Sequence, residues 1–582
     1  MVTTAAGMTE DRSRNGELNS SWAERVMLGL VLVVAALQFP LIFRINIGWD
    51  EFHFLSKIYE YHRGDLTNAL QTFHVHLFRW LPRSGGNEID QIIAARAVYY
   101  VLLLGTCGFM YLISRRFLTR AAGLFAVLLY LSYAEVIGFA TTFRYDGLGL
   151  FLSMGALTLA TRWPAVTASV VAAAGLAALS VIVTIKSLFY FPTLVLLLLI
   201  GAGGTKGSSN AVRAAAFVAV SVVSFATLYA LHNAALPNAT VSDSVTWVRF
   251  TGPTGILLTD LFAQRGYLLR SMAVNVWTWV YLAAGVAGLL LVALRKRHLG
   301  REVLVPLVLL IPLASLAVYR NAFPYYYVFI MPAAAIVAAV PFDAIVRGGQ
   351  KGSRVVAAAM VLVVLLGFGF HYRDHSRDET RAQRQLIEVV HRIFPYPAPY
   401  VDATSLIASF PKVGFFMSTW GMQRYRFTGE AVFEDLLLER RPLFVLTGGP
   451  IHIQDADTDN LSGGLLIEDR EVLRENFIPH WGPIYVAGKE LVVTDTDWTQ
   501  TEILIPGPYT VEALEPVLLQ SGVFTPGDVV TLEQGPVRIR SSAGSQKIKL
   551  RWGEKLYRPS ERPIPEPVIR GFYPCGTFLA AC

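Results

Sequence analysis

The chain has 582 residues, of which 53% are hydrophobic and only 16% are charged, and its mean hydropathy is +0.45. This composition excludes an ordinary soluble protein and a disordered one, and it predicts a chain that is partly embedded in a membrane. The net charge of +7 is spread over many short loops. It therefore indicates membrane topology, and we expect no nucleic-acid partner.

Long apolar segments recur from residue 23 to residue 372 and then stop. A segment of about 17–25 apolar residues is long enough to cross the hydrocarbon core of a bilayer. We therefore predict a polytopic α-helical membrane part, 23–372, with about eleven transmembrane helices. Because that number is odd, the two chain ends lie on opposite sides. The predicted spans are 23–43, 92–114, 121–141, 147–160, 165–185, 187–203, 211–232, 273–294, 303–319, 323–342 and 354–371.

The basic residues of the short loops predict the orientation, because lysine and arginine near a span resist translocation. With residues 1–22 in the cytoplasm, alternate loops carry these charges throughout the membrane part. The first outer loop 44–91, the loop 233–272 and everything after residue 372 then lie outside the cytoplasm. The basic residues of the predicted inner side are Arg115, Arg116, Arg120, Arg162, Lys206, Arg213, 295–301, Arg347, Lys351 and Arg354.

The residues after 372 predict an extracytoplasmic soluble region in two parts. Residues 373–480 alternate strand-like and helix-like segments, which favours a small α/β unit. Residues 481–582 show period-two alternation broken by Gly, Pro and Asp, which indicates an antiparallel β-rich module and tail. Its tail holds Cys575 and Cys582, for which a disulfide and two free thiols both remain open.

Candidate catalytic residues are the charged side chains at the predicted outer ends of the spans. A charge near a span end costs free energy unless it is solvated, paired or used for function. Carboxylates beside cations suit a displacement on a phosphate-bearing lipid, because one group takes a proton and another stabilises the departing phosphate. These residues are Asp50, Glu51, Arg144, Asp146, Lys186, Arg265, Arg270 and Arg320.

Three stretches carry a family resemblance: WDEFHF (49–54), RYDG (144–147) and PYYY (324–327). The first resembles the first-loop motif of protein O-mannosyltransferases and their bacterial relatives. These are the polyprenyl-phosphate-sugar-dependent glycosyltransferases of the GT-C superfamily, which include the aminoarabinose and galacturonic acid transferases that modify lipopolysaccharide. The resemblance implies an inverting enzyme of the bacterial inner membrane. Its donor is a polyprenyl-phosphate sugar, and its acceptor is an envelope glycan, lipid or protein.

The resemblance also implies residue roles. Asp50 matches the acidic residue taken as the general base, and Asp146 matches, more loosely, a second acidic residue that arranges a substrate. Glu51 belongs to the same candidate catalytic set, but adjacent side chains diverge, so we expect it to orient the loop or a neighbouring cation. Lys186 and Arg320 are expected near the lipid phosphate, because both are cations on the predicted outer side of the membrane. The candidate substrate-binding residues are His53, Arg144, Lys186, Arg265, Arg320 and Tyr325.

Metal use is the remaining chemical question for the first outer loop. On a strand, His74 and His76 would share a face, but two histidines without a third ligand do not define a zinc site. Some GT-C enzymes hold a divalent cation with an Asp-x-Asp or Glu-x-Asp motif, whereas Asp50 and Glu51 are adjacent. We therefore expect metal-independent chemistry and no cofactor, with a divalent metal left open.

Each candidate also has a simpler interpretation. The Asp50–Glu51 pair is compatible with interface solvation, RYDG with a turn, Lys186 with snorkelling to the headgroups, and PYYY with an aromatic belt. A polytopic transporter and a non-catalytic envelope assembly protein are the alternative functions. Convergence of the outer carboxylates and cations in one cleft would favour the enzyme, and a polar path through the membrane would favour transport.

Overall fold

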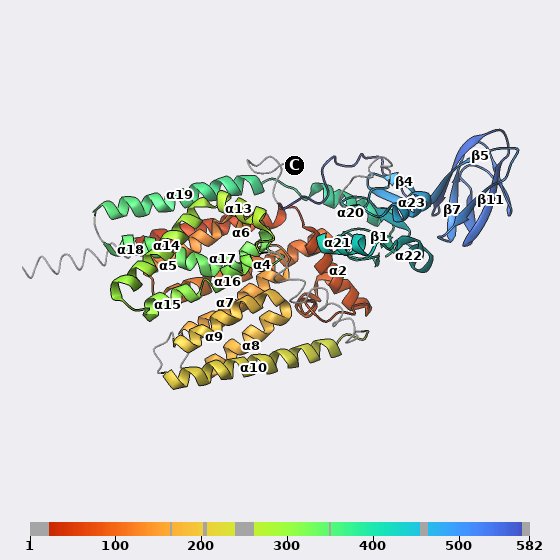
Figure 1. Cartoon of the computed structure of the whole chain (residues 1–582). Helices are drawn as coiled ribbons and strands as arrows, with labels where there is room; N and C mark the ends of the chain where they lie inside the picture. The colour runs from red at the N-terminus through yellow and green to blue at the C-terminus, as the bar shows by residue number, and fades with distance from the viewer. Residues whose placement is uncertain are drawn as a thin grey trace, which may run out of the picture.

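The structure is a computed structural model that describes residues 23–162, 166–201, 207–238, 261–348, 351–453 and 464–572. A helical bundle forms one end of the molecule, and a soluble region of helices and sheets forms the other (Figure 1). The chain therefore has the two parts that its hydropathy predicts, and they meet near the end of α19 (Lys351–His375).

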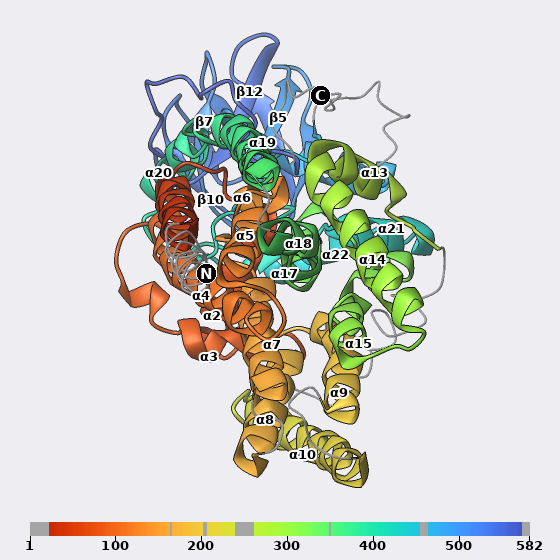
Figure 2. The same ribbon diagram turned by 90° about the vertical axis from the view of Figure 1, so that its left-hand side faces the viewer.

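Six helices among the described residues are long and apolar enough to cross a membrane. Helix also occupies the remaining predicted spans, in shorter or broken pieces, so the number of eleven crossings stays a prediction. Helix α17 lies at the centre of the bundle (Figure 2). The six long segments are Ala23–Phe43, Glu88–Ser114 (α4), Ser209–Ala234 in α10 (Gly207–Ala234), Val276–Lys296 (α14), Pro324–Gly348 (α17, Pro324–Ala338, and α18, Val340–Gly348) and Gly352–His375 in α19.

Two of the predicted spans are broken by local features that a hydropathy average does not show. Tyr133, in extended conformation, separates α5 from α6. Pro306 lies inside α15 and Pro312 lies in the first turn of α16, and proline removes a backbone donor from a helix. The shorter helices of the bundle are α5 (Arg120–Leu131), α6 (Ala134–Phe139), α7 (Tyr145–Arg162), α8 (Thr167–Val183), η3 (Ile185–Tyr190), α9 (Phe191–Ile200), α13 (Arg265–Val274), α15 (Arg301–Val308), α16 (Ile311–Ala314) and η4 (Ser315–Ala317).

The first outer loop is helical, with α2 (Trp49–Arg63), α3 (His74–Phe78) and η2 (Leu81–Arg83). Helix α2 begins directly after Gly48, whose backbone N–H donates to Glu51 Oε2 at 2.9 Å. It ends at Gly64, whose φ of +79° is readily available to glycine. The motif WDEFHF therefore forms the first turns of a helix at the end of the bundle that meets the soluble region.

The soluble region is built on a mixed sheet whose order is β10-β7-β12-β5-β3-β1-β2, with β4 also paired to β5. Strands β1, β2 and β3 are parallel, and β3 pairs with β5 in antiparallel fashion. Its helices are α20 (Arg381–Ile393), α21 (Thr419–Thr428), α22 (Phe433–Arg440) and α23 (Ile467–Asn476). Its first strands are β1 (Tyr400–Val401), β2 (Lys412–Val413), β3 (Phe444–Leu446) and β4 (Phe477–Trp481).

The β-rich module lies at the far end of the molecule (Figure 1). A second sheet of order β6-β11-β8-β9 packs there against the end of the first, and the two share one apolar core. Strand β5 runs from one part of the soluble region into the other. The strands are β5 (Ile484–Val493), β6 (Thr499–Ile503), β7 (Gly507–Glu512), β8 (Val517–Leu519), β9 (Gly522–Phe524), β10 (Val529–Leu532), β11 (Gly535–Ser541) and β12 (Gln546–Trp552).

The first outer loop and the soluble region share a single hydrophobic core. Phe52 and Leu55 of α2 pack in one cluster with Leu386 of α20 and Phe444 of β3. Because apolar burial is the largest favourable contribution to packing, this core holds the soluble region against the outer end of the bundle.

After β12 the chain turns back toward the bundle. We name residues 554–572 the C-terminal strap. Its Glu561 carbonyl accepts from Trp481 Nε1 at 2.7 Å, and Arg570 Nη1 donates to Glu379 Oε1 at 2.7 Å. Cys107 is a buried free thiol, whereas Cys575 and Cys582 lie outside the described residues.

Candidate active site

Four charged side chains form a chain of ion pairs at the end of the bundle that meets the soluble region. Arg144 pairs with Asp50 on α2, and its Nε lies 3.2 Å from Asp146 Oδ2. Lys186 Nζ lies 2.7 Å from the other oxygen of Asp146. Arg144 is therefore shared between two carboxylates, Asp50 and Asp146, that lie 96 positions apart in the sequence. The structure brings together four of the residues that the sequence singles out.

Tyr325 covers this chain of charges. The guanidinium carbon of Arg144 lies 3.5 Å from the centroid of the Tyr325 ring, and Lys186 Nζ lies 4.7 Å from it. Both distances are within the range of cation–π attraction. Tyr325 therefore orients the two cations, in addition to any role in an aromatic belt.

Asp50, Arg144 and Tyr325 line a cavity of about 600 Å³ between the bundle and the soluble region. Asp50 has 18% of its side-chain surface exposed, against 9% for Arg144. Asp146 and Lys186 are each only 4% exposed and lie behind Arg144. A ligand in the cavity would therefore meet Asp50 and Arg144, while the other two groups hold Arg144 in place.

Glu51 has a different environment from Asp50. It accepts from Arg96 Nε at 2.7 Å and from Arg96 Nη2 at 2.6 Å, and both side chains are 1% exposed. Its Oε1 also accepts from the backbone N–H of Phe143 at 2.7 Å. Glu51 thus links α2, α4 and the segment that leads into Arg144, and it holds the two halves of the site together. Sequence reasoning missed Arg96, which lies within a predicted span.

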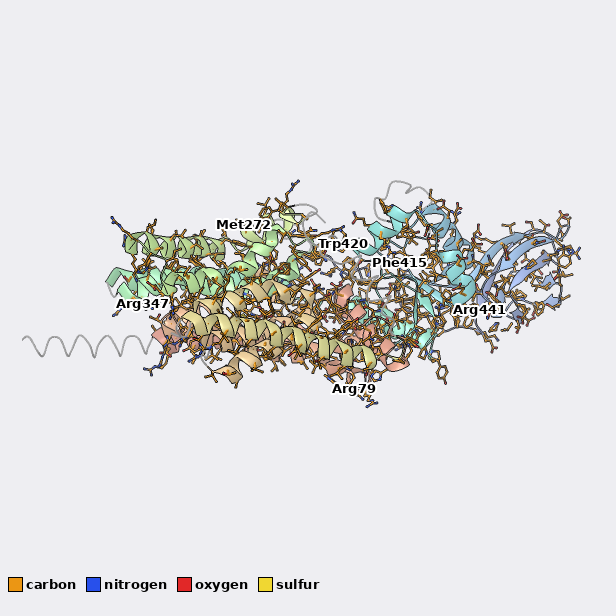
Figure 3. The ribbon with its side chains drawn as sticks, turned by 60° about the horizontal axis from the view of Figure 1, so that its bottom comes forward. Arg79, Met272, Arg347, Phe415, Trp420 and Arg441 are labelled. Atoms are coloured by element: carbon orange, nitrogen blue, oxygen red, sulfur yellow. The ribbon has the colours of Figure 1, made fainter. Side chains whose placement is uncertain are left out.

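The remaining candidates lie away from this chain of charges. His53 stacks on Phe416 with ring centroids 4.1 Å apart, and burial, followed by the charges of nearby lysines, holds the pKa of His53 well below its usual range. The guanidinium carbon of Arg320 lies 3.3 Å from the Trp420 ring centroid. Trp420 lies at the junction between the bundle and the soluble region (Figure 3). Arg265 begins α13 and is exposed. Among the described residues, the cavity lining includes none of these three candidates.

The histidines of the first outer loop do not share a strand face, because HVHLF forms the helix α3. His74 Nε2 lies 3.3 Å from the Phe54 carbonyl, whereas His76 Nε2 lies 2.7 Å from His232 Nδ1. The described residues contain no group of three or more His, Cys, Asp or Glu side chains arranged for a metal ion. Metal-independent chemistry stays a prediction.

A Glu-x-Asp spacing does occur in the first outer loop, at Glu88 and Asp90, and the sequence reasoning overlooked it. Glu88 Oε2 lies 2.9 Å from His391 Nε2, and Asp90 Oδ1 accepts from Arg384 Nη1 at 2.8 Å. Both acids therefore bind α20 of the soluble region, and neither lines the cavity in the described structure.

The C-terminal strap is a part of the site that no sequence pattern indicated. Residues 566–572 line the cavity. The Phe572 ring lies 5.8 Å from Tyr325, 5.5 Å from Phe323 and 6.4 Å from Trp49, measured between centroids. An aromatic ring from the far end of the chain thus packs on the residue that covers Arg144.

Solved structures resemble this fold. ArnT from Cupriavidus metallidurans, bound to undecaprenyl phosphate, is 15% identical over 73% of this chain and 93% of its own, with a TM-score of 0.50. The apo oligosaccharyltransferase of Archaeoglobus fulgidus is 11% identical over 72% of this chain and 69% of its own, with a TM-score of 0.47. Arabinosyltransferase EmbB from Mycobacterium smegmatis is 11% identical over 91% and 64%, with a TM-score of 0.39.

The likeness to ArnT, a GT-C glycosyltransferase, confirms for the fold the resemblance that the sequence suggests. The likeness covers a polytopic membrane part followed by a soluble C-terminal region. No protein-family model matches the chain, and no curated protein sequence matches it.

Proposed function

We propose that the protein is an inverting glycosyltransferase that moves a sugar from a polyprenyl-phosphate donor to an envelope acceptor. The observation that carries the proposal is that Asp50 and Arg144 meet at the wall of one cavity, with Asp146 and Lys186 paired behind Arg144. Convergence in a cleft is what separates an enzyme from a transporter, which needs a polar path through the membrane. A non-catalytic assembly protein would have no need of a carboxylate and a shared guanidinium at a cavity.

The donor phosphate binds at Arg144. A guanidinium matches a phosphate with parallel hydrogen bonds. Arg144 and Arg570 both line the cavity, but Arg570 pairs with Glu379 and Glu566, whereas Arg144 lies beside Asp50. The undecaprenyl phosphate bound to ArnT, which shares the fold, supports a donor of this class. When the donor phosphate binds Arg144, Asp50 loses its ion-pair partner, and its carboxylate becomes available to the acceptor.

The reaction is a single displacement at the anomeric carbon. Asp50 accepts the proton of the acceptor hydroxyl or amine as that atom forms its bond to the anomeric carbon. The bond from this carbon to the phosphate oxygen breaks on the opposite face, so the configuration inverts and the lipid phosphate leaves with the electron pair. General-base assistance of this kind contributes about 10² to 10⁴ in rate.

The charge balance of the site suits this displacement. Two carboxylates and two cations make the chain of ion pairs neutral before reaction. Proton transfer to Asp50 leaves one net positive charge beside the phosphate as the phosphate gains negative charge. Preorganised charge of this kind stabilises the transition state more than the ground state.

We place this chemistry at the outer face of the bacterial inner membrane, in line with the loop charges. Contacts between the predicted inner loops support their placement on one common side. Arg120 Nη1 lies 3.4 Å from Glu24 Oε1, and Arg347 Nη2 donates to the Phe117 carbonyl at 3.0 Å. Arg347 lies at the end of the bundle away from the soluble region (Figure 3).

Incubation of the purified protein with a panel of polyprenyl-phosphate sugars tests the proposal. Release of free polyprenyl phosphate from one donor is expected, and Asp50→Asn should reduce the rate by about 10² to 10⁴. Asp65→Asn is the matched control, because Asp65 is a 58% exposed carboxylate of the same loop that pairs with Arg63. Full activity of a correctly inserted Asp50→Asn protein would contradict the assignment.

A further inference from the structure

The soluble region faces the candidate active site with the carboxyl ends of its parallel strands. Strand β1 lies between β2 and β3, and all three run parallel. After β1 the chain continues to β2 on one side of β1. After β3 it continues through α23 and β4 to β5 on the other side. The order of the strands therefore reverses between β1 and β3.

In open α/β sheets, ligands bind in the crevice beyond the carboxyl ends of the strands at such a reversal. Here the residues that follow the two strands line the cavity that also contains Asp50 and Arg144. Asp402 and Thr404 come after β1, and Thr447, Gly448 and Gly449 come after β3. We name these residues the strand-end crevice. It forms the cavity wall that the soluble region contributes.

Asp402 supplies a hydrogen-bond acceptor in this crevice. Its Oδ2 accepts from the backbone N–H of Leu406 at 2.5 Å, and Thr404 Oγ1 lies 3.5 Å from Oδ1. Asp402 is 6% exposed, and burial raises its pKa despite the N–H of Leu406 and the charge of Lys412. A ligand hydroxyl is a suitable donor to Oδ1.

The two glycines leave room for a ligand. Gly449 has a φ of +58°, and a Cβ atom built there would meet no atom of the described residues within 4 Å. The threonine hydroxyls of Thr404 and Thr447 add polar contacts, while Leu446 and Met417 give the cavity an apolar surface. Alternating hydroxyls and apolar C–H groups on a ligand would match this mixture.

We propose that the strand-end crevice is the acceptor subsite and that the acceptor is a hydroxyl-rich glycan. The inference rests on the proposed function. The donor's lipid phosphate reaches Arg144 from the membrane side, so the opposite wall receives the water-soluble partner. A peptide acceptor would be held most simply along an exposed strand edge, whereas the crevice presents strand ends. The glycan lies across the crevice with its reacting hydroxyl directed at Asp50.

Two variants test the subsite by different means. Asp402→Asn keeps the shape and an oxygen for the Leu406 N–H, but it removes the charged acceptor. Gly449→Asn places a side chain in the open space, and asparagine tolerates the left-handed backbone better than other residues. Glu430→Gln, an exposed carboxylate of the same region, is the matched control.

The binding experiment uses the full chain in detergent and saturation-transfer NMR. The probes are soluble gluco-, galacto-, manno- and arabino-trisaccharides, together with serine- and threonine-containing peptides. We expect one class of trisaccharide to bind, and both variants to raise its Kd about tenfold or more, while Glu430→Gln does not. Binding of the peptides alone, of no probe, or of a trisaccharide equally to all variants would overturn the proposal.

An activity experiment separates this inference from the proposed function. Without an acceptor, both variants should still release polyprenyl phosphate from the donor by slow hydrolysis. With an acceptor, they should raise its KM about tenfold and leave the donor KM unchanged. Wild-type protein that cleaves no donor would refute the proposed function. Wild-type cleavage with an unchanged acceptor KM in both variants would refute the subsite alone.

Discussion

Replacement of Glu51 by glutamine should destabilise the protein far more than replacement of its neighbour Asp50 by asparagine. Glu51→Gln removes the charge that faces Arg96, while the guanidinium remains buried with 1% of its side chain exposed. Breaking a buried ion pair by removing one partner costs about 3–5 kcal/mol, because a charge is left uncompensated. That is a large part of the roughly 5–15 kcal/mol by which a folded domain is stable.

The carbonyls around Arg96 do not replace the lost carboxylate. Arg96 already donates to the backbone oxygens of Ile42, Ile45 and Asn46 at 3.1, 2.8 and 3.1 Å. These contacts satisfy its N–H groups but carry no negative charge. In Asp50→Asn, by contrast, Arg144 keeps Asp146 as a partner, and Asp50 is partly exposed to the cavity.

The two variants should therefore separate stability from catalysis. Thermal unfolding followed by intrinsic fluorescence in one detergent measures stability, and release of polyprenyl phosphate measures activity. Glu51→Gln should melt well below the wild type and keep more transfer activity per folded molecule than Asp50→Asn. A Glu51→Gln protein that melts like the wild type yet is as inactive as Asp50→Asn would refute this division of roles.

Three further predictions concern contacts around the site. Lys186→Ala should weaken donor use by about 1.5–3 kcal/mol, because a charged hydrogen bond to Asp146 is lost. Arg320→Ala should change the donor KM less, because Arg320 stacks on Trp420. Equal losses in the two variants would contradict this placement of the two cations. Burial lowers the pKa of His391, but the hydrogen bond to Glu88 outweighs burial and raises this pKa overall. The stability that the contact contributes is therefore present below about pH 6.5 and falls as pH rises through the raised pKa. Melting curves should show this slope in the wild type and not in His391→Gln. Phe572→Ala should lower both kcat and the melting temperature, because Tyr325 and its neighbours lose ring contacts worth about 0.5–1.5 kcal/mol each, and Phe572→Tyr should retain both.

Much of the membrane part could be predicted because the signal is local. The apolar segments, the basic loops and the position of Asp50 directly after the first span are all readable within short windows of sequence. Their helices follow, since a backbone in lipid must satisfy its own hydrogen bonds. The same windows could not show where a segment breaks: the interruption at Tyr133, between α5 and α6, is set by packing.

The tertiary structure decides which residues make up the site. Sequence placed Asp50, Arg144, Asp146 and Lys186 on one side of the membrane, but only folding makes Arg144 the shared partner of two carboxylates. Lys186 and Arg320 look alike in sequence as outer-face cations, yet one lies behind Arg144 and the other stacks on Trp420. The side of the membrane and the residue type limit which charged side chains can come together. The packing of the helices decides which of these side chains form contacts.

The sequence by itself determined a membrane bundle with Asp50 just after its first span and a region of mixed structure after the bundle. Only the tertiary structure decided that Glu51 pairs with Arg96, 45 positions away, and that Phe572 from the far end of the chain packs on Tyr325. It also decided that the strand ends after β1 and β3 face the same cavity as Asp50. The physical reason is that hydropathy and charge act on each segment separately, whereas ion pairs, ring contacts and a shared core depend on segments distant in sequence.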